Sequence, residues 1–475
     1  MTVPAADDAI VELEQEVIGA MLAGGDHRQV LAALDDDHIA EPVHRQIIEA
    51  IRIALDRYGT SALPTVARLI PLETQTAFKT STGMELGSYL ASMVANTSMS
   101  RITLPRGIRA VARQWARREI GQEAAAAAEA AKDPTADPAH LIRTLMGRAD
   151  EIGASIRQAH RVKTRMSMDE AIDLSISEAR AAQERKGLVG ITTGLIDLDR
   201  AIGGFQRRDL NVIAARPAMG KTTLAVALAR AAAQAGHGVG MFTLEMDNAK
   251  IGARFASDIA HLGGHRVPYQ DIIRGSFDSE QETRIAEART AYGDLGICLE
   301  DQSGLNMAAI RIKTEAMLED AERAGRPLHL LLVDHLGKIR PSTRYAGNRN
   351  NEIGEITDGM KELAREYELA VVLLSQLSRG VESREDKRPG LMDLRDSGNI
   401  EQDADTVMFL YREAYYLEQR RPENMDQRIE WEADLSACRN KAELIIGKQR
   451  NGPTCTIDLF MDVACSAVRN AARSF

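Results

Sequence analysis

The stretch Ala-Arg-Pro-Ala-Met-Gly-Lys-Thr, residues 215–222, decides how this sequence folds. It follows a strand-like run over 209–215 and leads into a helical run over 222–230. A strand, a tight loop ending in Gly-Lys-Thr and a helix together form the phosphate-binding P-loop, in which loop N–H groups and the helix N-terminus face the phosphate charge. The residues predicted to hold a nucleotide are Ala215, Arg216, Pro217, Ala218, Met219, Gly220, Lys221, Thr222 and Thr223.

Two side chains of this loop have separate predicted tasks. The Lys221 ammonium reaches the β- and γ-phosphate oxygens, and the Thr222 hydroxyl ligates Mg²⁺. The first glycine that is usual in such loops is replaced by Ala215. We expect its small Cβ to be tolerated, because the strand enters the turn there.

Composition predicts a soluble protein of more than one domain. The chain has 475 residues, of which 44% are hydrophobic and 27% are charged. At about 100–200 residues per domain, two or three domains are expected. No apolar run approaches the ~20 residues of a membrane helix, and the acidic N-terminus lacks a signal-like apolar core. We therefore expect a cytoplasmic protein without a membrane partner.

Charge and cysteine usage exclude two classes of protein. A net charge of −10 argues against a nonspecific DNA coat, but it is compatible with a ring that holds DNA in its channel. The four cysteines are scattered and have no Cys-x-x-Cys spacing, which argues against a zinc site or a disulfide framework. They are predicted to be free, buried thiols.

The chain changes character twice. Residues 1–160 show helical stripes and no strand pattern, which predicts an all-α N-terminal domain. Residues 161–190 predict a linker with an amphipathic helix, whose narrow apolar stripe needs a groove on its own domain or on a neighbouring subunit. Residues 191–475 alternate strands and helices, which predicts an α/β domain with a mostly parallel sheet. Its predicted strands are 209–215, 239–244, 328–333, 370–374, 406–411 and 443–447.

Polar side chains follow several predicted strands, at the edge where parallel α/β sheets bind ligands. Asp334 ends a buried strand and is predicted to hold the water shell of Mg²⁺ beside Thr222. Glu245 follows the first strand after the P-loop helix, where it is predicted to act as general base on the attacking water; an ordinary helix-start glutamate is the alternative. Gln376 follows the strand 370–374, where its amide can touch the γ-phosphate and report the nucleotide state.

Two cations near the C-terminus form another candidate site. Lys448 and Arg450 are two residues apart, so their side chains point the same way in an extended segment. Asn451-Gly452 predicts a hairpin turn after them. Two cations at a strand end suit the γ-phosphate of an adjacent subunit. From these residues alone, exposed turn charges fit equally well.

These motifs resemble the DnaB family of replicative helicases. The resemblance is carried by residues 215–222, Leu-Glu-Met at 244–246, Leu-Ser-Gln-Leu-Ser-Arg at 374–379, the segment 393–405 and Gly-Lys-Gln-Arg-Asn-Gly-Pro at 447–453. The segment 190–205 resembles the entry to the family's motor domain. Residues 14–22 with His44-Arg45 resemble its helical domain more loosely.

The resemblance implies a RecA-like motor assembled as a homo-hexameric ring. Such a motor is an ATP-dependent 5′–3′ DNA helicase that translocates on single-stranded DNA and unwinds the duplex at a replication fork. In this reading, Lys221 and Glu245 act on the nucleotide, Gln376 couples its state to DNA, and Lys448 and Arg450 complete the neighbour's site. The segment predicted to hold the DNA backbone in the channel is Arg395, Asp396, Ser397 and Gly398.

The sequence also departs from the family pattern. His335-Leu336-Gly337 stands where Tyr-Leu-Gln is usual, and Asp396 stands where glutamate is usual. Such divergence fits a plasmid or phage copy. The helical domain matches weakly, which leaves the family's primase and helicase-loader partners open for this chain.

Two other functions compete with the helicase. One is a RecA-fold, DNA-dependent recombination ATPase, against which the helical domain, the linker helix and the segment 393–405 argue. The other is a protein that binds helicase rings without unwinding. A complete set of Lys221, Glu245, Asp334 and Arg450 argues against it, because a non-catalytic binder needs no such set.

Overall fold

The structure is a computed structural model that describes residues 6–25, 27–99, 104–160, 168–184, 188–293, 295–342 and 347–471. The chain forms two compact units, Met1–Met166 and Ser167–Phe475. Each unit has its own hydrophobic core, so each can be understood by itself.

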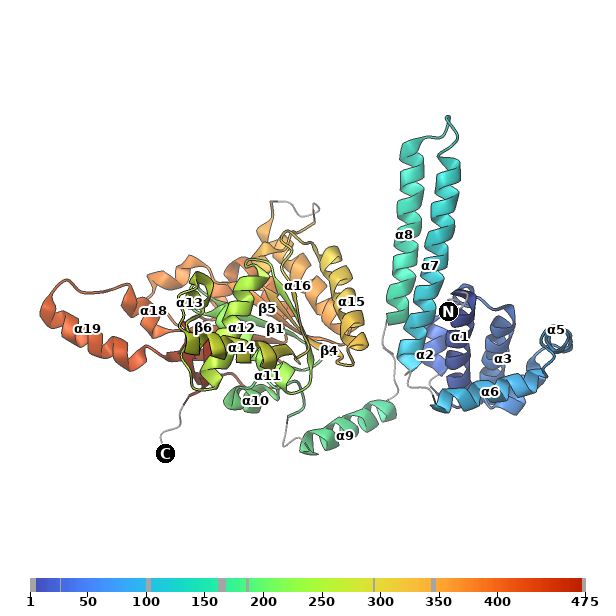
Figure 1. Cartoon of the computed structure of the whole chain (residues 1–475), viewed down its shortest axis with the longest axis horizontal. Helices are drawn as coiled ribbons and strands as arrows, with labels where there is room; N and C mark the ends of the chain where they lie inside the picture. The colour runs from blue at the N-terminus through green and yellow to red at the C-terminus, as the bar shows by residue number, and fades with distance from the viewer. Residues whose placement is uncertain are drawn as a thin grey trace. The chain divides into compact units, whose positions relative to one another are not determined.

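The first unit contains only helices among its described residues. Its core draws on the apolar faces of α1, α3 and α6, and Figure 1 shows α7 and α8 as a long helical hairpin. The helix α7 ends before Asp133 and Pro134, and proline disfavours continuation of a helix. The helices are α1 Ala6–Leu22, α2 His27–Ala33, α3 Pro42–Tyr58, α4 Leu63–Leu69, α5 Leu72–Thr82, α6 Leu86–Met99, α7 Leu104–Ala130 and α8 Pro138–His160.

A buried polar cluster joins the helices of this unit. Glu14 and His44 are both fully buried, and His44 Nδ1 lies 2.7 Å from Glu14 Oε2. Glu14 also accepts the backbone N–H of Glu41 at 3.2 Å, and His44 Nε2 lies 2.8 Å from the Tyr89 hydroxyl. Buried polar groups need such partners, so these family-like residues fix how α1, α3 and α6 pack.

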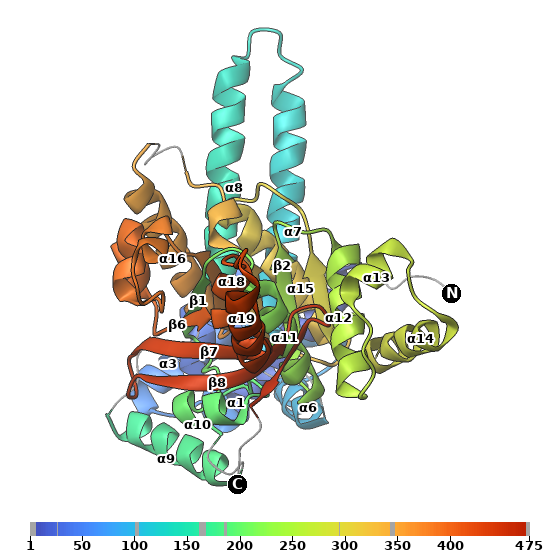
Figure 2. The ribbon, with the colours of Figure 1, turned by 90° about the vertical axis from the view of Figure 1, so that its left-hand side faces the viewer.

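The second unit is built on a nine-stranded sheet with the order β3-β2-β4-β5-β1-β6-β7-β8-β9. Neighbours run parallel from β3 to β6, whereas β7, β8 and β9 form an antiparallel edge, visible in Figure 2. The strands are β1 Leu210–Ala215, β2 Gly238–Thr243, β3 Ile297–Glu300, β4 Leu328–Asp334, β5 Ala370–Gln376, β6 Thr406–Tyr411, β7 Lys441–Gln449, β8 Cys455–Asp462 and β9 Ala467–Asn470. The mostly parallel sheet is confirmed; β3, β8 and β9 were not predicted.

Helices cover both faces of this sheet. Alternate residues of β1 join different cores: Ile213 packs on the side of α11, and Val212 packs on the side of α16. The helices are α9 Met168–Glu184, α10 Ile196–Ile202, α11 Lys221–Gln234, α12 Asn248–Leu262, α13 Tyr269–Arg274, α14 Ser279–Gly293, α15 Met307–Arg323, α16 Arg349–Glu366, α17 Gly398–Asp403, α18 Glu413–Glu418 and α19 Met425–Cys438. Short 3₁₀ segments are η1 Asp36–His38, η2 Leu336–Lys338, η4 Arg379–Ser383 and η5 Leu391–Ser397.

The structure corrects the prediction about the cysteines. All four are free, but only Cys438 and Cys465 are buried; Cys455 is exposed and Cys298 is half-buried. Cys455 starts β8 beside the turn of the β7–β8 hairpin, where its side chain meets solvent.

The apolar stripe of α9 is not covered by the described part of this chain. Met168, Ile172 and Ile176 all remain exposed. A groove for this stripe, on its own domain or on a neighbouring subunit, stays a prediction. No described helix has the length and apolar character needed to cross a membrane.

Candidate functional site

The predicted phosphate loop connects β1 to α11. Ala215 is the last residue of β1 and pairs with Gln376 of β5, so its backbone is extended and accepts alanine. The left-handed positions of the loop come later, at Ala218 (φ 64°) and Gly220 (φ 99°). A Cβ on Gly220 would also lie 2.9 Å from Met461 Sδ. Glycine is therefore needed at Gly220 and not at Ala215.

Lys221 is a buried cation at the start of α11. Its Nζ donates a hydrogen bond to the backbone carbonyl of Ser375, at 2.9 Å. Burial lowers the pKa of Lys221 to about 8, although the charges of Asp334 and Glu245 oppose that shift. A buried ammonium is favoured by added negative charge, so this pocket suits phosphate oxygens.

Thr222 and Asp334 meet beside Lys221. The Thr222 hydroxyl donates to Asp334 Oδ2 at 2.6 Å, which joins the start of α11 to the end of β4. Burial raises the pKa of the Asp334 carboxyl, and the Thr222 hydrogen bond and Lys221 oppose this. A hydroxyl and a carboxylate oxygen suit Mg²⁺, which often keeps several waters and substrate phosphates as ligands. Within the described ranges, no group of three or more His, Cys, Asp or Glu side chains lies in metal-binding reach.

The side chain of His335 lies between Glu245 and Gln376. His335 Nδ1 accepts the backbone N–H of Gly337 at 3.1 Å, so the proton of the neutral ring sits on Nε2. That Nε2 lies 3.2 Å from Glu245 Oε2 and 3.1 Å from the Gln376 side-chain amide. The N–H fits the Glu245 carboxylate, and the Gln376 atom nearest the same ring nitrogen is its amide nitrogen, Nε2. Glu245, the predicted base, and Gln376, the predicted sensor of the nucleotide state, thus both contact the His335 imidazole.

A hollow of about 530 Å³ runs from this histidine toward the predicted DNA segment. Glu245, His335 and Gln376 line it together with Asp393 and Leu394 of η5. The Asp393 carboxylate is buried and accepts the N–H of Gly390 at 2.8 Å, which fixes the start of η5. The nucleotide corner and the DNA segment are therefore neighbours in space.

The predicted DNA-binding residues follow Leu394 directly in the chain. The backbone of Arg395, Asp396 and Ser397 completes η5, and Gly398 begins α17 with helical backbone angles. The side chains of Arg395, Asp396 and Ser397 lie outside the described part of the structure. Their contacts with DNA remain a prediction.

Lys448 and Arg450 lie at the opposite edge of the sheet. Lys448 pairs with Val407 at the beginning of β6, and Arg450 forms an ion pair with Asp405, Nη1 to Oδ1, at 3.0 Å. Asp405 in turn accepts the N–H of Leu210, the first residue of β1. Lys221 follows the far end of that six-residue strand, so the two sites are separated by roughly 17 Å of strand at about 3.3 Å per residue.

The structure thus divides the predicted catalytic residues into two groups. Lys221, Thr222, Asp334, Glu245 and Gln376 converge at the carboxyl edge of the parallel strands. Lys448 and Arg450 do not join them within one chain. The sequence reasoning missed His335 as their link, although its departure from the family pattern was noted, and it missed Asp405 as the partner of Arg450.

The sequence has relatives over its whole length. Residues 190–470 match the family described as DnaB-like helicase C terminal domain. The replicative DNA helicase DnaB of Rickettsia typhi is 32% identical over 490 residues, which cover 99% of this chain and 94% of that protein. The replicative DNA helicase DnaC of Bacillus subtilis is 38% identical over 277 residues, or 58% of this chain and 55% of its own length.

Solved structures agree with these relatives. A DnaB-like replicative helicase, described with its interactions with primase, superposes with a TM-score of 0.57 at 27% identity, covering 97% of this chain and all (100%) of that one. A second solved structure, described as an ATPase domain, has a TM-score of 0.55 at 32% identity and covers 65% of this chain and 100% of its own. The resemblance drawn from the motifs and the RecA-like motor fold are confirmed. This chain belongs to the DnaB family of replicative DNA helicases.

Proposed function

We propose that this ATP-dependent DNA helicase hydrolyses ATP at sites shared between neighbouring copies of a six-membered ring. One observation carries the proposal: Lys221 and Arg450 lie at opposite edges of the same sheet. A head-to-tail contact between copies would bring one edge against the other. Contacts of this kind close into rings when the rotation between copies allows it.

At the carboxyl edge, the P-loop backbone and Lys221 would hold the phosphates of ATP. Thr222 and Asp334 would hold Mg²⁺, which supplies positive charge to the phosphoryl oxygens. Their 2.6 Å hydrogen bond supports this proposal, because it holds the two oxygens side by side. The buried Asp334 carboxylate would be stabilised as an anion by that cation.

Glu245 would act as general base on the water that attacks the γ-phosphate. Its side chain is 48% exposed, which leaves room for water beside it. The His335 N–H would hold one carboxylate oxygen and leave the other for the water. Gln376 contacts the same ring, so a change at the γ-phosphate would reach η5 through the hollow that Gln376 and Asp393 line.

At the amino edge, Lys448 and Arg450 would act on the γ-phosphate held by the next copy. Charge supplied in trans stabilises the transition state of phosphoryl transfer. Arg395, Asp396, Ser397 and Gly398 would hold the backbone of single-stranded DNA, and sequence-tolerant contact suits a translocating motor. Primase is proposed as a partner because the similar solved helicase is described with its interactions with primase.

Strand displacement on a forked duplex tests the function directly. The full chain with ATP and Mg²⁺ should separate the strands, and a Lys221→Ala variant should bind the fork without separating it. The mass of the assembly with ATP and single-stranded DNA should equal six protomers or a multiple of six. An indefinite series of masses would indicate a filament, and ATP-independent binding without unwinding would indicate a ring-binding protein; either result would contradict the proposal.

A further inference from the structure

We propose that the carboxyl end of α17, together with Asp405, is a seat that positions the trans-acting cations and links them to the DNA segment. The inference rests on the trans role proposed above. Lys448 Nζ donates to the carbonyl of Ala404 at 2.8 Å and also to that of Glu401. Arg450 Nη2 donates to the carbonyl of Gln402 at 2.9 Å. Free carbonyls at a helix C-terminus favour cations.

Asp405 completes the seat with a fixed carboxylate. It is buried, and its two oxygens are shared among the Lys361 ammonium, the Leu210 N–H and the Arg450 guanidinium. The Arg450 side chain is nevertheless 44% exposed. A planar guanidinium has five N–H donors, so Arg450 can stay on Asp405 and Gln402 while it presents other donors outward.

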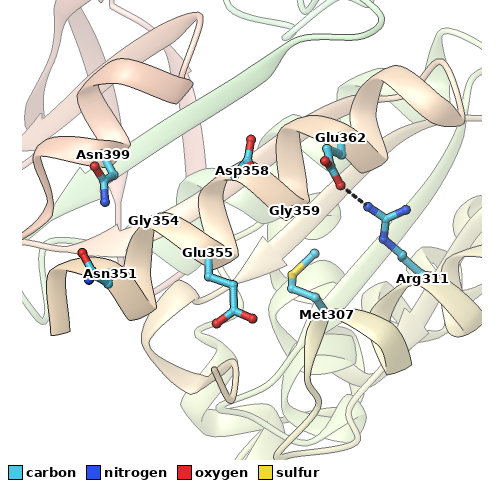
Figure 3. A pocket seen from close by; sticks show the side chains of 9 residues that line it. All are labelled: Met307, Arg311, Asn351, Gly354, Glu355, Asp358, Gly359, Glu362 and Asn399. Carbon is cyan, nitrogen blue, oxygen red and sulfur yellow. Dashed lines mark hydrogen bonds and ion pairs between the residues drawn. The ribbon is translucent and has the colours of Figure 1, made fainter. Parts of the chain in front are cut away.

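Helix α17 is itself held firmly on α16. The Thr357 hydroxyl donates to Asp403 at 2.5 Å, and the Asn399 amide donates to the carbonyl of Asn350 at 3.0 Å. A Cβ on Gly354 would lie only 2.2 Å from Asn399 Nδ2, so glycine there permits the close approach. Figure 3 shows Asn399 and Asn351 at the end of a hollow of about 570 Å³ along α16, where the two helices meet.

The seat would couple DNA bound to one subunit with the ATP site of the next subunit. Helix α17 begins at Gly398, the last residue of the predicted DNA segment, and ends at Asp403, beside the seat. Because α17 is one continuous helix of six residues, a shift of its first residue would also move its last residue, together with the part of α16 on which it is held. DNA bound at 395–398 would therefore set where Lys448 and Arg450 point, and so whether the next subunit's site is complete.

Rings that mix two variant subunits test this inference, because the loss of ATPase should depend on which subunit carries the change. A Lys221→Ala subunit supplies intact cations, and an Arg450→Ala subunit supplies an intact P-loop; mixed together, they should regain ATPase. Asp405→Asn added to the Lys221→Ala subunit should lower the regained ATPase by about 10–100-fold, the range for residues that orient a functional group. The same change added to the Arg450→Ala subunit should have little effect. Stimulation of the regained ATPase by single-stranded DNA should fall in the first arrangement only.

Asp358→Asn is the matched control, because Asp358 is an exposed carboxylate on α16 that lines the neighbouring hollow and is not one of the seat residues. It should show no such asymmetry. Equal loss from Asp405→Asn on either subunit would mean a merely structural role, and no loss on either would mean no role; both overturn the inference. If Asp405→Asn fails to assemble, Asp405→Glu keeps the charge but displaces it and should show the same asymmetry. If the unmodified pair regains nothing in rings that do form, the trans assignment itself fails.

Discussion

The two edges of the sheet make an instructive comparison. At the carboxyl edge, Lys221, Thr222, Asp334, Glu245 and Gln376 are joined by contacts within a single chain. At the amino edge, Lys448 and Arg450 contact backbone carbonyls and the Asp405 carboxylate of their own chain. The carboxyl edge carries the phosphate-binding loop. The amino edge carries two cations that suit a phosphate but has no such loop beside them.

If Lys448 and Arg450 act in trans as proposed, hydrolysis is a property of the interface between copies. A protomer would then hold ATP with the carboxyl edge alone, and the transition-state charge would need the amino edge of another copy. Regulation can then act on placement of the cations, without any change in the P-loop. Changes at each edge should therefore produce different kinds of loss.

Arg450→Ala should give the largest effect. Loss of a cation supplied in trans lowers the rate of phosphoryl transfer by ~10³–10⁵-fold. ATP binding should be nearly unchanged, because the P-loop edge is intact, and equilibrium binding of a fluorescent ATP analogue would verify this. Full ATPase in the Arg450→Ala variant would show that the amino edge has no catalytic role.

Glu245→Gln should come next, with ATP hydrolysis slowed by ~10²–10⁴-fold while ATP still binds. Glutamine keeps the shape and the contact with His335 but cannot take a proton. In a mixed ring, the subunit that supplies the intact P-loop can carry Arg450→Ala and ATPase should return. If that subunit carries Glu245→Gln instead, ATPase should not return. Loss of nucleotide binding, or normal turnover, would rule out the general-base role.

The carboxyl edge was predictable because its signals are local in sequence. The P-loop, Asp334 and Gln376 each end or follow a strand, and parallel strands end at a common edge, which brings such residues together. β8 also had a usable signal, since Ile457, Leu459 and Met461 alternate into the core, but it was not predicted. β3 has four residues, all half-buried, and gives little pattern.

The amino edge was not predictable in the same way. Lys448 and Arg450 were found as charges, but their partners are mostly backbone carbonyls, and every residue has a carbonyl. Asp405 lies in a family motif whose sequence does not reveal that Arg450 will reach it across β6 and β7. The position of His335 between Glu245 and Gln376 likewise depends on how β2, β4 and β5 end side by side.

His335→Ala should have a smaller effect than either change above. His335 orients Glu245 without touching the reacting atoms, and loss of such a partner costs about 10–100-fold. The loss should appear in kcat more than in KM, measured by steady-state ATPase. His335→Gln restores an N–H donor and should recover part of the rate. Lys338 lines the same hollow, so a Lys338→Ala variant serves as the control. Equal losses of ATPase from His335→Ala and Lys338→Ala would contradict a specific role of His335 in orienting Glu245.

Deletion of residues 1–160 should change the intrinsic chemistry least, because it touches neither edge. The second unit keeps its own cores, and every nucleotide contact described above lies within it. Since the two edges meet only when copies assemble, weaker assembly should appear as ATPase per protomer that rises with protein concentration. At high concentration, the DNA-stimulated rate should approach that of the full chain within a few-fold. Sedimentation at matched concentrations would show whether ring formation follows the same rise. If the truncated protein forms rings as readily as the full chain and its specific ATPase is independent of concentration, the helical unit does not help to bring the two edges together.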